Sequence, residues 1–338
     1  MVFSSHIFVF YFLPLLLLVY YNLPYRWRNF SLTIFSYAFY GWWKPWFVTL
    51  MMTSTAVDFI CAKVISASNA SRKRRIGAMV VSCCVNLGLL GFFKYYMFFM
   101  DGLNSLCEMV DADTFRVLRV VLPIGISFYT FQTMSYTIDV YRGDAPPVRS
   151  LSDFSCFVAL FPQLIAGPII RYHTVDDQLA YREHKVSRFA SGIAIFVVGF
   201  AKKILLANPM GEVADAAFGA ASPCAMDAWF GVLAYAFQIY FDFSGYSDMA
   251  VGLGRMIGLE FPKNFNAPYL ADSITDLWRR WHISLSTFLR DYLYIPLGGN
   301  CKGKSRTYIN LAIVMLLGGL LAWGQVEFSG MGCLPMGC

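Results

Sequence analysis

The sequence predicts an all-α protein, a bundle of helices that crosses a membrane several times. Hydrophobic residues make up 57% of the 338 residues and charged residues only 14%. The apolar residues form long runs, and the basic residues lie mostly between these runs. A water-soluble domain carries roughly a quarter charged residues, and a disordered chain is poor in aromatic residues. The composition therefore excludes both of these classes.

The charges and cysteines fit a membrane protein better than a nucleic-acid-binding or metal-binding one. The net charge is +6. Because the basic residues flank apolar runs, we attribute this charge to membrane topology and expect no nucleic-acid partner. The nine cysteines are odd in number and show no paired metal-ligand spacing. We interpret most of them as small apolar core residues and expect no metal ion and no bound cofactor.

The apolar runs define the expected helices in order. They cover residues 7–21, 30–43, 47–67, 76–99, 117–140, 154–170, 189–206, 228–251 and 308–323. A spanning helix needs about 20 residues, so the shorter runs are expected to be tilted or re-entrant. The first run has no basic segment before it and no cleavage site after it, which favours a retained span over a signal peptide. The amphipathic stretch 171–188 predicts an interfacial helix.

The basic residues also predict which side of the membrane each loop faces. Arg26 and Arg28 follow the first run, and four consecutive basic residues at 72–75 follow the third. The loop after the fourth run is acidic, with Asp101, Glu108, Asp111 and Asp113. We expect the protein to lie in the cytoplasmic (inner) membrane. Because cytoplasmic loops carry an excess of lysine and arginine, we expect its basic loops to face the cytoplasm and its N-terminus to face the outside.

Three apolar segments carry polar residues, which are costly inside a membrane and therefore candidates for function. In the first, residues 122–139, Pro123 and Gly125 interrupt the helical pattern. Side chains such as Gln132 and Thr133 then supply replacement hydrogen bonds. This pattern is typical of helix–helix packing, and the alternative is the lining of a polar cavity.

In the second segment, residues 240–248, Asp242 and Asp248 lie in an otherwise apolar aromatic helix. Six residues apart, they do not share a helical face, so a paired acid–base dyad is not expected. Each needs its own partner, and the arginines at 255, 279 and 280 are the candidates. A structural ion pair and a site role are both open. The glycines at 252, 254 and 258 predict close helix packing rather than nucleotide binding.

The third segment, residues 276–291, contains the strongest candidate for chemistry. On a continuous helix, Arg279, His282 and Ser286 would share one face, and Asp276 would reach Arg280. A lone histidine is usually structural. One that lies among arginines and tryptophans beside a membrane core is a candidate for proton transfer.

Several long strings in these segments resemble the membrane-bound O-acyltransferase family, in particular its alginate O-acetyltransferase branch. The resemblance covers residues 1 to about 320. Its strings are Met1-Val-Phe-Ser-Ser, Leu122-Pro-Ile-Gly-Ile-Ser-Phe-Tyr-Thr-Phe-Gln, Phe161-Pro-Gln-Leu-Ile-Ala-Gly-Pro-Ile, Gly199-Phe-Ala-Lys-Lys, Tyr240-Phe-Asp-Phe-Ser-Gly-Tyr-Ser-Asp, Phe261-Pro-Lys-Asn-Phe-Asn-Ala-Pro-Tyr and Trp278-Arg-Arg-Trp-His-Ile-Ser-Leu-Ser.

The resemblance implies a helical membrane body, with short re-entrant and interfacial helices, around a central funnel or tunnel. It implies transfer of an acetyl group from an acyl thioester to hydroxyls of an exported, alginate-like polysaccharide, or relay of that group to a periplasmic or extracellular partner. The family's motif histidine corresponds to His282, which we expect to act as the base. We expect the wall of the substrate site to be formed by Gln132, Tyr240, Asp242, Ser244, Arg279, Trp281 and Ser286.

The chain departs from the family after residue 320. The family has a second, catalytic histidine in a Trp-His-Gly string there, whereas residues 321–338 contain no histidine. We expect this tail to be out of frame, because with suitable codons the deletion of one base at codon 321 restores Trp-His-Gly. Resequencing across that codon tests the prediction. A chain with this tail is expected to show little acyl transfer, and normal turnover would make His282 the only base.

Other functions remain open on the sequence alone. D-alanyl transfer to a cell-wall polymer is the nearest alternative, and a catalytically inactive scaffold is another. A transporter would suit the polar residues in the spans, but the inverted hydropathy repeats expected of one are not found.

Overall fold

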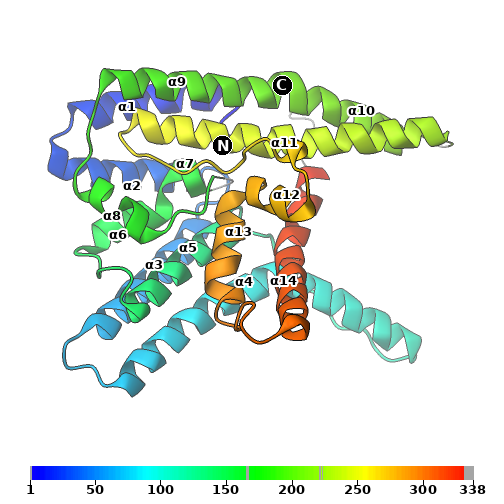
Figure 1. Ribbon diagram of the computed structural model, residues 1–338, viewed down its shortest axis with the longest axis horizontal. Coiled ribbons are helices and arrows are strands. Elements are labelled where there is room, and N and C mark those ends of the chain that lie inside the picture. The colour runs from blue at the N-terminus through cyan, green and yellow to red at the C-terminus, as the bar shows by residue number, and fades with distance from the viewer. Residues whose placement is uncertain (1, 165–166, 221, 223, 331–338) are drawn as a thin grey trace.

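The computed structural model describes residues 2–164, 167–220, 222 and 224–330, with side chains described up to residue 320. Within these residues every regular element is a helix, which confirms the all-α prediction (Figure 1). The elements are η1 (Phe8–Phe12), α1 (Leu13–Asn22), α2 (Tyr25–Gly41), α3 (Phe47–Ser66), α4 (Arg72–Met109), α5 (Ile126–Arg142), α6 (Leu151–Ala159), α7 (Phe161–Leu164), α8 (Tyr172–Ala180), α9 (Val186–Ala201), η2 (Lys202–Ala207), α10 (Asn208–Phe218), α11 (Ala225–Met256), η3 (Pro268–Leu270), α12 (Ile274–Arg280), α13 (Ile283–Leu289), η4 (Arg290–Tyr294) and α14 (Lys304–Gly330).

Three helices among the described residues are long and apolar enough to cross a membrane. They are α3, α4 and the continuous helix Val186–Phe218 that joins α9, η2 and α10. At 1.5 Å per residue, a helix of the length of α4 spans about 57 Å, well beyond the ~30 Å hydrocarbon core of a bilayer. The chain is therefore a polytopic membrane protein, as predicted. The central funnel or tunnel stays a prediction, as does the division at residue 320, since residues 331–338 of the tail lie outside the described residues.

Two of the predicted apolar runs do not form single helices. In the run 117–140 the helix begins only at Ile126, because Gly125 has a φ of +76° and Pro123 lacks an amide hydrogen. In the run 154–170 the chain forms α6 and then the short α7, with Leu160 in a non-helical conformation before Pro162. Proline is tolerated in the first turn of a helix but not in its interior, so the run is divided here. Residues 165–166 of this run lie outside the described residues.

Among the described helices, α9 and α11 share the most extensive interface, and they run side by side along the top of Figure 1. Glycines make the close approach possible. A Cβ atom added at Gly252 would lie 2.6 Å from the carbonyl oxygen of Gly192, and one added at Gly199 would lie 2.5 Å from that of Gly245. The predicted close packing at Gly252 is confirmed, and most residues of α11 between Ser244 and Met256 are buried.

Candidate functional site

His282 lies at a sharp break between α12 and α13. Its backbone is left-handed, with a φ of +42°, so Arg279, His282 and Ser286 do not share the helical face that the sequence predicts. Residues 264–266 pair with the chain on both sides of the break. The Ile283 amide donates to the carbonyl oxygen of Asn264 (2.9 Å), and the Asn266 amide donates to that of Arg280 (2.9 Å). These bonds take up backbone groups that a continuous helix would pair internally.

The His282 imidazole is buried and held by one amide. Its exposed fraction is 7%, and its Nδ1 lies 3.1 Å from Oδ1 of Asn264. Because a side-chain amide oxygen only accepts hydrogen bonds, Nδ1 carries the proton. Among the described residues Nε2 makes no hydrogen bond, so its lone pair is free. Burial lowers the pKa of His282 well below its usual value, so the ring is neutral at pH 7.

Asn264 also organises the start of α13. Its Oδ1 accepts from the backbone amide (3.2 Å) and the hydroxyl (2.9 Å) of Ser284. The Ser284 hydroxyl oxygen in turn accepts from the Ile169 amide at 3.0 Å, which joins the segment before α8 to the site. The Asn264 Nδ2 is buried and has no hydrogen-bond partner among the described residues. It is a donor available beside the imidazole.

Aromatic rings enclose the other sides of His282. The Phe243 ring meets the imidazole edge-on at 4.8 Å, and Phe265 lies 6.3 Å away. The Tyr240 and Trp281 rings lie 6.1 Å apart and both pack against Phe265. Of the predicted lining residues, Tyr240 and Trp281 are therefore brought to His282. Ser244 lies one residue beyond Phe243, and its Oγ is buried without a hydrogen bond among the described residues.

The remaining predicted lining residues have other contacts. Gln132 donates to the carbonyl oxygen of Phe157 at 2.8 Å, which favours the packing interpretation of its segment. Asp242 pairs with Lys203 at 2.7 Å, on the side of α11 that faces η2. Arg279 is exposed, and the Ser286 hydroxyl donates to the carbonyl oxygen of Trp281.

The predicted arginine partners of the two aspartates are wrong. Asp242 pairs with Lys203 and Asp248 with Lys202 (2.6 Å), both lysines lying on the π-helical turn η2. The wider π-helical turn lets two consecutive lysines face α11. The regular α-helical spacing assumed from the sequence does not predict this. The predicted Asp276–Arg280 pair is confirmed at 2.6 Å.

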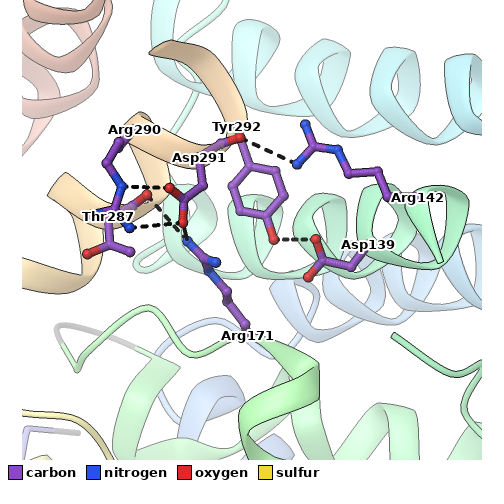
Figure 2. A network of polar contacts seen from close by, with 7 residues as sticks. All are labelled: Asp139, Arg142, Arg171, Thr287, Arg290, Asp291 and Tyr292. Carbon is purple, nitrogen blue, oxygen red and sulfur yellow. Dashed lines mark hydrogen bonds and ion pairs between the residues drawn. The ribbon is translucent and has the colours of Figure 1, made fainter. Parts of the chain in front are cut away.

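A second polar network holds the chain that follows α13 (Figure 2). Arg171 pairs with Asp291 at 2.5 Å, and the Tyr292 hydroxyl donates to Oδ1 of Asp139 at 2.6 Å. Burial opposes ionisation of Asp291, but Arg290 and Arg171 outweigh it and hold the pKa of this carboxyl below its usual value. The network borders a cleft of about 460 Å³ with arginines and carboxylates on its walls. Within the described residues, no group of three His, Cys, Asp or Glu side chains is placed to hold a metal ion.

Two of the residues that form the site were not among the predicted ones. Asn264 and Phe243 contact His282 directly, yet they come from segments 18 and 39 positions earlier in the sequence. A signal was present for Asn264, since it is a polar residue within the string Phe261-Pro-Lys-Asn that carried the family resemblance.

Comparison with known proteins identifies the relatives of this arrangement. The model of the membrane-bound O-acyltransferase family matches residues 148–321, which include His282 and Asn264. The chain is 50% identical over 320 residues to "Probable alginate O-acetylase AlgI" of Azotobacter vinelandii, covering 95% of this chain and 64% of that protein.

More distant relatives differ in the group or polymer that their names specify. The chain is 35% identical over 352 residues to the peptidoglycan O-acetyltransferase of Helicobacter pylori, covering 94% of this chain and 66% of that protein. It is 30% identical over 180 residues to the teichoic acid D-alanyltransferase of Bacillus subtilis, covering 51% of this chain and 45% of that protein. The chain thus spans about two thirds of the length of the acetyl-transferring relatives.

Proposed function

Because the chain belongs to the membrane-bound O-acyltransferase family, we propose that it serves in the transfer of an acetyl group from an acyl thioester to hydroxyls of an exported, alginate-like polysaccharide. The protein either transfers the acetyl group to the polysaccharide directly or relays it across the membrane to a periplasmic or extracellular partner protein. Both routes use the same chemistry. Acetyl transfer is preferred over D-alanyl transfer because the O-acetylating relatives match almost the whole chain and the D-alanylating relative only half of it.

The observation that carries this proposal is the buried, neutral imidazole of His282, with Nδ1 occupied by Asn264 and Nε2 free. A hydroxyl that attacks a thioester carbonyl must lose its proton, and a neutral imidazole can accept it. Nε2 takes that proton as the C–O bond forms. The tetrahedral intermediate then breaks its C–S bond, and the departing thiolate takes the proton back from the imidazolium. The products are an ester and a free thiol.

Asn264 has two parts in this scheme. Its Oδ1 fixes the tautomer that leaves Nε2 basic. Its Nδ2, which is buried without a hydrogen bond among the described residues, is a further donor on the Nδ1 side of the ring that a polar group of the substrate can use.

We further propose that the protein lies in the cytoplasmic (inner) membrane with its N-terminus outside. The support is the alternation of basic and acidic loops along the first four apolar runs. This orientation lets a cytoplasmic thioester and an external acceptor approach from opposite sides.

The test replaces His282 by alanine and measures two quantities in membranes that contain the partner proteins. These are acetylation of the polysaccharide and co-purification of the partners. We expect acetylation to fall at least a hundredfold while co-purification persists, because only the base is removed. The exposed His6, replaced by alanine, is the matched control and should change neither. Acetylation that persists in the His282 variant contradicts the proposal. A wild-type chain that binds partners without acetylating supports the scaffold alternative, and it is the result expected if the tail after residue 320 abolishes transfer. The fold-change for His282→Ala then has to be measured in a chain whose reading frame is restored at codon 321.

A further inference from the structure

A cluster of cationic side chains lies where α1, α2 and the loop before α9 meet, at the left of Figure 1. Tyr20 comes from the end of α1, Arg28 from α2, and Arg182 and His184 from the loop 181–185. The guanidinium of Arg28 lies over the Tyr20 ring at 5.2 Å and over the Tyr25 ring at 5.6 Å. The cluster is separate from His282 and has no part in the chemistry proposed above.

The hydrogen bonds fix where the protons of this cluster lie. The Tyr20 hydroxyl donates its one proton to the carbonyl oxygen of Ile257 (2.8 Å). It must therefore accept from Nη1 of Arg182 (3.2 Å) and from Nε2 of His184 (2.9 Å). His184 thus carries its proton on Nε2, and its unprotonated Nδ1 lies 3.4 Å from Nη1 of Arg28.

The two guanidinium groups lack a direct counter-charge. Arg182 is only 4% exposed, and its other bonds go to the carbonyl oxygen of Gln178 and to Oδ1 of Asn29. No carboxylate among the described residues lies within ion-pair distance of Arg28 or Arg182. Asp153 is reached only through the Asn29 amide. Burying a cation without an anion is costly, so an anion from outside the chain would stabilise this arrangement.

The electrostatics of His184 agree with an excess of positive charge. Burial lowers the pKa of His184, and the neighbouring Arg28 and Arg182 lower it further. The nearest acidic side chain in sequence, Glu183, is instead paired with Lys185 at 2.9 Å and lies within 3.6 Å of Arg188.

The surroundings of the cluster are those of a membrane–water interface. Tyr25, Trp27 and Tyr181 are 41%, 47% and 74% exposed. Aromatic side chains of this kind gather at the level of lipid headgroups. The alternation of loops places Arg28 on the same side as the basic residues 72–75, which is the cytoplasmic side in the proposed orientation. Anionic lipids are concentrated in that leaflet.

We propose that Arg28, backed by the buried charge of Arg182, binds the phosphate of an anionic phospholipid headgroup in the cytoplasmic leaflet, while His184 accepts from Arg28 through Nδ1 and holds it in place. Arg28 is only half-buried, so its guanidinium contacts the phosphate directly. Arg182 is buried behind it and adds positive charge that attracts the phosphate. The bound lipid neutralises the cluster and ties together the ends of α1, α9 and α11, which already meet through Tyr20 and His184.

The test measures binding of short-chain phosphatidylglycerol to the purified full chain in a neutral detergent. Arg28→Gln is the main variant. Arg26→Gln is the control, because Arg26 is an exposed arginine on the same helix outside the cluster. A basic residue that acts only through general surface attraction contributes about fivefold to binding. We expect Arg28→Gln to weaken binding more than tenfold, Arg26→Gln to weaken it less than fivefold, and Arg28→Lys to restore most of the affinity.

Three outcomes would overturn the proposal. Equal losses from Arg26→Gln and Arg28→Gln would show general attraction only. Equal binding of short-chain phosphatidylcholine would show that the headgroup charge is not recognised. Binding of inorganic phosphate with the Arg28 dependence, but not of phosphatidylglycerol, would assign the site to a soluble anion. The thermal midpoint of each variant, measured without lipid, separates lost binding from lost folding.

Discussion

At the scale of single residues, the arrangement around His282 makes Asn264 the residue that decides how well the imidazole works. Replacing Asn264 by alanine removes the acceptor that fixes the tautomer, while Phe243 still packs against the ring. We expect kcat for acetyl transfer to fall about 10- to 100-fold with little change in KM. A kcat that is unchanged by Asn264→Ala would refute the positioning role.

Asn264→Asp gives a sharper readout at the same position. The carboxylate keeps the acceptor but favours the imidazolium, so the pKa of His282 should rise from its low buried value. Because the neutral ring is the active form, the acidic limb of the pH–rate profile should move to higher pH. Activity measured between pH 5 and 9 tests this, as a merely structural role of Asn264 would leave that limb in place.

The ionisation of Asp291 makes the folding stability, rather than the reaction rate, depend on pH. Its pKa is lower in the folded protein than in the unfolded chain, where it is about 3.9. The pairs with Arg290 and Arg171 therefore add stability above about pH 4, and that stability is lost as the pH falls through the folded pKa. Asp291→Asn should lower the free energy of unfolding by about 1–3 kcal/mol at pH 7 and by much less at acidic pH. Thermal unfolding in detergent measures this, with exposed Asp113→Asn as the control.

The sequence predicted His282 but not its geometry. A lone histidine among arginines and tryptophans is a local signal that, together with the family motif, makes His282 the candidate base, and its role stays a prediction. The left-handed turn at His282 depends on backbone bonds to Asn264 and Asn266, which no local spacing reveals. For the same reason the regular spacing wrongly predicts that Arg279 and Ser286 share a face with His282, because the helix break removes that face.

At the scale of elements, the α9–α11 crossing depends on the absence of side chains. In Gly252→Ala the new Cβ would lie 2.6 Å from two backbone atoms of α9, so the helices must separate. We expect a loss of about 1–3 kcal/mol in stability. Gly91→Ala in α4 is the control, since nothing lies within 4 Å of its added Cβ. Alanine favours a helix over glycine, so that variant should be neutral or stabilised. Equal thermal midpoints for the two variants would contradict the packing argument.

Pairing between elements was harder to predict than the elements themselves. The sequence predicts that the carboxylates of Asp242 and Asp248 each need a partner, and both have one. The partners are Lys202 and Lys203 because a π-helical turn in the middle of the long helix changes which residues face α11. Such a turn follows from packing in three dimensions and leaves no spacing pattern in the sequence.

At the scale of the whole molecule, composition was enough to predict a helical membrane protein, because burial in lipid requires long apolar helices. Among the described residues, fewer helices are both long and apolar enough to span than the apolar runs suggest. Proline and glycine divide two of the runs, and α4 continues far beyond its apolar part. An apolar run reports burial in lipid or protein alike, so it does not determine which helices cross.

The orientation of the whole chain is testable with single cysteines in a background without the other cysteines. Cys224 is exposed in the turn between α10 and α11. The opposite end of α11 contacts Tyr20 beside the predicted cytoplasmic loops, so Cys224 should face outside. Ser68→Cys lies in the loop before the basic residues 72–75, and Val2→Cys marks the N-terminus. In intact cells, a membrane-impermeant maleimide should label Cys224 and Val2→Cys but reach Ser68→Cys only after permeabilisation. The reversed pattern would place the N-terminus and Cys224 in the cytoplasm. The Arg28 cluster would then face the outer leaflet, and the positive-inside argument would fail for this chain.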